Sequence, residues 1–239
     1  MTNTYVLPES QWEVTFLDKS DADISYHESV CRLLDLLTVN ISNAFCITDI
    51  PIGKVTNIPF SKNPLKVAGE NAIILDASPG CYWGQYAFQY AHEMCHYLID
   101  SQWPPMRDEW FEEVICECSS RYWLNWLSKS NFYPWFSDSF KNYAFQRTLN
   151  INSFDLKDLQ DEESQVLTYF RRNHESRLHF NFLANQIMPI INDDSEIWSE
   201  MLLLRTISDN FTFIENLGNL ISQSLNHKES FERILDLFL

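Results

Sequence analysis

The sequence predicts an α+β fold with its strands in the N-terminal part and only helices in the C-terminal part. Short segments with the alternation or the apolar content of strands occur before residue 80. Two long helical stretches follow, and beyond Pro134 the periodicity is helical throughout. The chain has 239 residues, of which 45% are hydrophobic and 15% aromatic, so it is long enough to bury a substantial core.

The N-terminal elements follow from local periodicity and from chain breakers. Residues 12–17 alternate apolar and polar side chains, which is the period of a half-buried strand. Residues 27–39 place their apolar side chains at helical spacings. Further strands are expected at 44–48, 54–60 and 72–75, where Pro51, Gly53 and the pair Pro79–Gly80 mark the turns.

Two helices then carry most of the chemically interesting residues. The first is expected from 83 to 100 and is stopped by Pro104 and Pro105, and the second is expected from 109 to 128. We therefore expect a catalytic domain at 1–130 and a helical subdomain at 131–239. The helices of that subdomain are expected at 155–172, 175–191, 194–207, 212–225 and 228–238.

Composition limits the possible partners and the compartment. The net charge of −16 repels phosphate backbones, so a nucleic-acid partner is not expected. No apolar run is long enough to cross a bilayer, and the N-terminus has no basic region followed by an apolar one, so we expect a cytoplasmic protein without a membrane anchor. The six cysteines contain no C-x-x-C pair and are expected to be small buried hydrophobes.

Residues 92–96 form the pattern His-Glu-x-x-His. On a helix, His92 and His96 are four residues apart and share a face, so both imidazoles can reach one metal ion. Glu93 lies one residue further round and can touch a water on that ion without ligating it. The helix is apolar on nearly all sides, where two histidines and a glutamate would be costly unless something satisfies them. The alternative is that the histidines bond to backbone while Glu93 lies at the surface.

A zinc hydrolase needs a third protein ligand and an open position for water. Neither a histidine nor an aspartate stands six residues beyond His96, where Gln102 lies. The acids that follow lie on the next expected helix, where Glu109, Glu113 and Glu117 share a face and any of them could point at the histidines. His96 and Glu113 lie at similar distances, roughly 6–7 Å, from the connecting loop, which favours Glu113. Glu112 lies about 100° from Glu113, and we expect it, like Glu109, on a solvated face.

The segment from Glu112 to Glu117 resembles the N-E-x-x-S-D segment of thermolysin-like gluzincins, and Trp110 to Glu113 resembles the W-x-x-E of gluzincin aminopeptidases. The resemblance covers about 45 residues and implies a zincin-like small mixed sheet with an active-site helix. It implies Glu113 as the third zinc ligand and Glu117 as the acid that orients His92. Glu112, Cys116 and Glu117 stand where the family pattern has asparagine, serine and aspartate.

The sequence therefore predicts a Zn²⁺-dependent hydrolase of the metallopeptidase class, with Glu93 as the catalytic base and a peptide or protein as substrate. The resemblance also implies that substrate adds a strand to a sheet edge, for which 54–60 and 72–76 are the candidates. Oxyanion donors are sought among Tyr169, His174 and His179, beside the arginines at 171, 172 and 177. The alternative function is a zincin scaffold that binds or regulates a partner without catalysis. The oligomeric state is left open.

Overall fold

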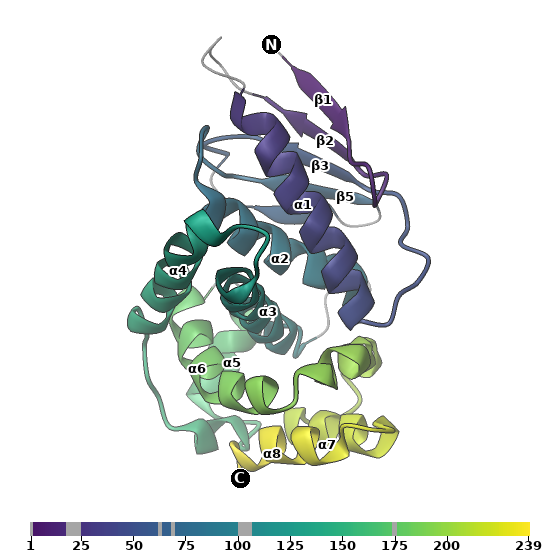
Figure 1. Ribbon diagram of the computed structural model, residues 1–239. Coiled ribbons are helices and arrows are strands. Elements are labelled where there is room, and N and C mark those ends of the chain that lie inside the picture. The colour runs from purple at the N-terminus through teal and green to yellow at the C-terminus, as the bar shows by residue number, and fades with distance from the viewer. Residues whose placement is uncertain (1, 18–24, 62–63, 68–69, 100–106, 174–175) are drawn as a thin grey trace. The chain divides into compact units, whose positions relative to one another are not determined.

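The α+β prediction is confirmed in a computed structural model, which describes residues 2–17, 25–61, 64–67, 70–99, 107–173 and 176–239. A small mixed sheet forms in the N-terminal part, and the remaining described chain is mostly helical (Figure 1). Among the helices in these ranges, none combines the length and apolar character that a membrane span requires.

The sheet has five strands in the order β1-β2-β3-β5-β4. The three central strands, β2, β3 and β5, run parallel, whereas β1 and β4 pair antiparallel at the two edges. The central strands direct alternate side chains into the core, as expected for a half-buried sheet. The bounds are Asn3–Val6 for β1, Glu13–Phe16 for β2, Lys54–Asn57 for β3, Leu65–Val67 for β4 and Ala72–Leu75 for β5.

Two of the strand expectations are wrong. Residues 44–48 form no strand, because helix α1 (Ser25–Ala44) continues to Ala44 and the chain then turns at Cys46, which has a positive φ of 57°. The amide of Ile47 donates to the carbonyl of Ser42 at 2.9 Å, so this turn satisfies the end of the helix instead of a sheet. The segments 54–60 and 72–76 do not supply the sheet edge either, because β3 and β5 each pair on both sides.

Helix α2 (Trp83–Ile99) follows the last central strand and is fixed to the sheet by its glutamines. Gln89 accepts a hydrogen bond from the amide of Asp76 at 2.9 Å, and Gln85 accepts one from the amide of Ser78 at 3.1 Å. On another side of α2, the Tyr90 hydroxyl meets the Thr38 hydroxyl of α1 at 2.5 Å. These bonds fix the rotation of α2 about its axis, and therefore the direction of the residues that follow Tyr90.

The chain divides into two compact units, and the division passes through helix α3 (Trp110–Lys129). One unit comprises residues 1–98 and 119–146, which include the sheet, α1, most of α2 and the second half of α3. It also includes the 3-10 turn η1 (Pro134–Phe136) and most of α4 (Ser137–Leu149), a helix that periodicity did not predict. The other unit comprises 99–118 and 147–239. The domain boundary expected at residue 130 lies just after the end of α3, and the division between the two units does not coincide with it.

In its described residues the second unit forms helices joined by turns and loops, without a strand, and each expected helical stretch is present with bounds that differ by a few residues. The stretch at 155–172 is split in two, because Ser164 caps a new helix by accepting the amide of Leu167 at 3.0 Å. The stretch at 194–207 is 3-10 rather than α-helical. The elements are η2 (Leu156–Leu159), α5 (Gln165–Arg172), α6 (Arg177–Asp193), η3 (Ser195–Thr206), α7 (Phe213–Gln223) and α8 (Lys228–Asp236).

Candidate metal centre

The two histidines of the motif lie on α2 with their rings directed at the same point. Both side chains are half-buried, and the two Nε2 atoms are 3.3 Å apart. Zinc bound to two imidazoles at 2.0–2.1 Å with a tetrahedral angle requires the two nitrogens to be about 3.3–3.4 Å apart. The observed separation therefore fits zinc, and it also fits a hydrogen bond between two neutral imidazoles. The third group at the site has to distinguish these cases.

The second half of α3 is anchored to α2 by two serine side chains. Ser119 donates its hydroxyl to the carbonyl of Ala91, and Ser120 donates to the carbonyl of Phe88, both at 3.0 Å. The higher-numbered serine meets the lower-numbered carbonyl, so the two helices run antiparallel.

Glu113 is grouped with the two histidines as a possible ligand of one metal ion. The ligand atoms of His92, His96 and Glu113 all lie within 4.8 Å of one another, and Glu113 is half-buried like the histidines. Two imidazole nitrogens and one carboxylate oxygen are the protein donors of a catalytic zinc site. The three residues expected as ligands are thus one group of possible metal ligands, and their donor atoms are of the kinds that zinc binds.

A second group of possible donors shares one histidine with the first. His96, Glu112 and Cys116 also have ligand atoms within 4.8 Å of one another. Glu112 is only 4% exposed, so the expectation that it lies on a solvated face is wrong. The physical reason is that this part of α3 has little solvated surface. The neighbours of Glu112 along the helix are buried as well, including Phe111, Val114, Ile115 and Cys116. Sequence periodicity could not predict the burial of Glu112, because a cluster of glutamates on a helix indicates a face exposed to solvent.

The two other expected site residues are buried carboxylates. Glu93 is 4% exposed and Glu117 is 8% exposed. A buried carboxylate is costly unless a cation or hydrogen bonds satisfy it. Glu93 is turned about 100° from His92 around α2, which suits a group that touches a metal-bound water without ligating the metal. A divalent cation beside them would be one way to offset the cost of their burial.

The residues considered as oxyanion donors are engaged in other contacts. Arg171 donates to Asp108 and Glu162. The Ser176 hydroxyl lies 2.7 Å from Nδ1 of His179 and donates to the Tyr169 hydroxyl at 3.2 Å. Burial also lowers the pKa of His179. These contacts give Arg171, Tyr169 and His179 a structural role in the fold. His174 lies outside the described part of the chain.

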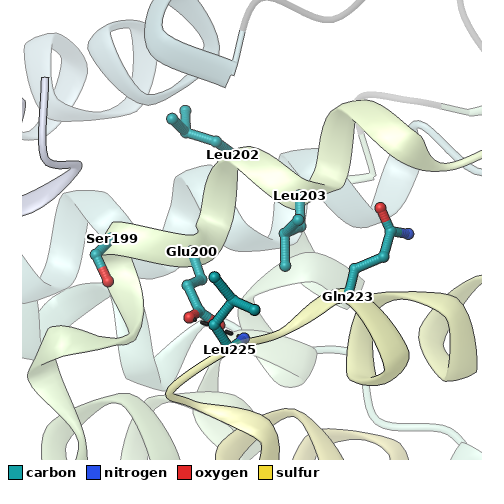
Figure 2. Close-up of a pocket in the computed structure, with 6 residues that line it drawn as sticks. All are labelled: Ser199, Glu200, Leu202, Leu203, Gln223 and Leu225. Carbon is teal, nitrogen blue, oxygen red and sulfur yellow. Dashed lines mark hydrogen bonds between the residues drawn. The ribbon is translucent and has the colours of Figure 1, made fainter.

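A pocket of about 180 Å³ lies elsewhere, between η3 and the end of α7 (Figure 2). Three leucines line it, and its polar groups serve the local backbone. The Glu200 carboxylate accepts the amides of Leu225 at 3.1 Å and Asn226 at 2.8 Å, while the Gln223 amide donates to Thr206 at 3.1 Å. We therefore assign this pocket a structural role. Its lining residues are Ser199, Glu200, Leu202, Leu203, Gln223 and Leu225.

Comparison of the chain with protein-family models, with curated proteins and with solved structures found no match.

Proposed function

We propose that the protein is a zinc-dependent hydrolase, of the metallopeptidase class, with Zn²⁺ held by His92, His96 and Glu113. The observation that carries this proposal is that the ligand atoms of His92 and His96, on the helix with the H-E-x-x-H pattern, and of Glu113, on α3, lie within 4.8 Å of one another. A structural site would need no additional acid beside the histidines, whereas Glu93 supplies one. The resemblance to gluzincins in the α3 segment supports the same assignment.

The chemistry follows from the positions of the side chains. Zinc bound at these donors would polarise a water and lower the pKa of that water toward neutrality. Glu93 takes the proton from the attacking water and then delivers it to the leaving amine. Glu117 is proposed to hold His92 in the tautomer that leaves its Nε2 free to ligate, as carboxylates beside metal-bound histidines do.

The substrate that suits this arrangement is an extended peptide or protein segment. Strand β4 is an edge strand, so its outer side can pair with an added strand. The six cysteines are free thiols, which is in keeping with a reducing compartment, and we place the protein in the cytoplasm. A basic peptide is the best first substrate, because the chain carries a net charge of −16.

The test is a measurement of zinc content together with turnover of a mixed peptide library. We expect about one zinc per chain, hydrolysis that stops when a chelator removes the metal, and recovery when zinc is added back. Protein that contains no zinc after purification in its presence, and that cleaves no member of the library, would contradict the proposal.

One observation favours a second candidate function, a binding scaffold with a structural metal. The buried donors Glu112 and Cys116, with His96, form a second group that could hold an ion, and a thiolate is a frequent ligand in structural zinc sites. Substitution with Co²⁺ separates the two, because a thiolate ligand gives a strong charge-transfer absorption in the near ultraviolet. We expect no such band in the catalytic arrangement. A band that disappears in Cys116→Ser would favour the scaffold.

A further inference from the structure

A partly buried network of charged side chains includes Arg107 and Asp108, which lie just before α3. Arg171, in the last turn of α5, donates to both oxygens of Asp108, from Nε at 2.7 Å and from Nη2 at 3.3 Å. It also donates to both oxygens of Glu162, at 2.9 and 3.1 Å. Arg107 adds a second positive charge beside Glu162 at 3.4 Å. The four residues together are neutral, so the network balances its own charge.

The geometry of this network requires an arginine at position 171. Its side chain is 12% exposed and that of Asp108 is 1% exposed, so water cannot replace the lost bonds. Only a planar guanidinium presents donors in pairs to two carboxylates at once, and a lysine ammonium cannot reproduce this arrangement. Arg172, the next residue on the same helix, is exposed and carries the same charge. It is therefore a matched control.

The network holds the start of the helix that carries Glu113. The carbonyl of Asp108 accepts the amide of Phe111 at 3.1 Å, so Asp108 belongs to the first turn of α3 through its backbone as well. Glu112 and Glu113 also lie in this first turn. Trp110 packs against Phe170, the residue before Arg171, and against Phe213 of α7, with ring centroids 5.1 and 4.8 Å apart.

The same contacts reach the start of α7. The amide of Phe213 donates to Glu162 at 3.2 Å, and Arg107 donates to the carbonyl of Phe211 at 2.6 Å. The first turn of α3 is thus tied to α5 and to α7 by directional bonds. Buried ion pairs often contribute little to stability compared with apolar packing, and their best-attested use is to specify one geometry.

We propose that Arg171 is a positioning residue for the metal centre: it holds Asp108, and through Asp108 it fixes the first turn of α3 and the position of the Glu113 carboxylate. This inference rests on the proposed zinc site. A zinc ligand displaced by a fraction of an ångström loses affinity, as it does when the groups that orient a ligand are removed.

The test compares Arg171→Ala and Arg171→Lys with Arg172→Ala in the full chain, using Zn²⁺ and Co²⁺ alone as probes. Zinc affinity is measured by competition with a chelating indicator, and the Co²⁺ visible spectrum reports the coordination geometry. We expect Arg171→Ala to bind zinc about 10–100-fold more weakly and to change the cobalt spectrum. Arg171→Lys should recover part of the affinity, and Arg172→Ala should behave as wild type.

Asp108→Asn keeps the shape of the side chain and serves if Arg171→Ala fails to fold. It should weaken zinc binding in the same direction. A purely structural network would lower the melting temperature of these variants and leave the affinity and the cobalt spectrum unchanged, and that result would overturn the inference alone. Wild-type protein that binds no zinc would overturn both the inference and the proposed function.

Discussion

Replacement of Glu113 by alanine tests which carboxylate completes the proposed metal site. The ligand atoms of His92, His96 and Glu113 lie within 4.8 Å of one another, whereas Glu112 shares its group with His96 and Cys116. The two glutamates are neighbours in sequence, yet their side chains leave α3 about 100° and 1.5 Å apart. One short stretch of helix therefore offers two mutually exclusive ways to complete the site.

The magnitude follows from the number of donors. Structural zinc sites with four ligands bind with about 10–16 kcal/mol, which is about 2.5–4 kcal/mol for each ligand. At about 1.4 kcal/mol for each factor of ten, loss of one ligand weakens binding about 100–1000-fold. We therefore expect Glu113→Ala to lose most of its zinc at concentrations that saturate the wild type.

The assay is competition for zinc with a chelating indicator, performed with Glu113→Ala, Glu112→Ala and Glu109→Ala side by side. Glu109→Ala should bind as wild type. Glu112→Ala should keep its zinc, although the burial of Glu112 makes a loss of stability expected. Full zinc binding by Glu113→Ala together with an empty Glu112→Ala would refute the assignment and transfer the site to the group with Cys116.

Three further predictions concern the surroundings of the site and the fold. Glu117→Ala should retain zinc but bind it about 10–100-fold more weakly, as measured in the same competition assay. Gly53→Ala should lower the free energy of unfolding in urea by about 1–3 kcal/mol, because the added Cβ would lie 2.7 Å from the buried ring of Trp12. Gly218→Ala is its control: nothing lies within 4 Å of the added Cβ, and the change should stabilise α7 by about 0.5–1 kcal/mol. Acid should also destabilise the second unit through Glu162. Burial raises the pKa of the Glu162 carboxyl, but the hydrogen bonds and charges of Arg171 and Arg107 outweigh burial. They hold this pKa below its ordinary value of 4.5. A lowered folded pKa gives stability that is present above the unfolded value and is lost as the pH falls through the folded value. Glu162→Gln should therefore flatten the loss of stability that occurs as the pH falls below 4.5, and an unchanged pH dependence would contradict this expectation.

The elements around the motif were predictable because their periodicity is strong. Helices α2 and α3 lie within a residue or two of their expected bounds, as do the strands β2 and β5. Strands β1 and β4 were missed because neither contains a buried side chain, so neither shows the apolar pattern of a strand. Helix α4 was missed because it buries only Phe140 and Ala144, so its sequence shows no apolar face.

The site was predictable to the extent that it is local in sequence. His92, Glu93 and His96 follow from one turn of one helix, and Glu113 follows from the length of the connection to the next helix. The burial of Glu112 was not predictable, because it depends on which chain segments cover α3. The contact of Arg171 with Asp108 joins residues 63 positions apart, and no periodicity or motif reports such a pair.

The measurement that tests the central claim most directly is a comparison of wild-type protein with Glu93→Gln, in which zinc content and peptide turnover are determined on the same samples. The substitution removes the base and keeps the three zinc ligands, the size of the side chain and one of its acceptor oxygens. We predict equal zinc content in both proteins and hydrolysis only in the wild type. Equal hydrolysis by both proteins would contradict the assignment of Glu93 as the catalytic base.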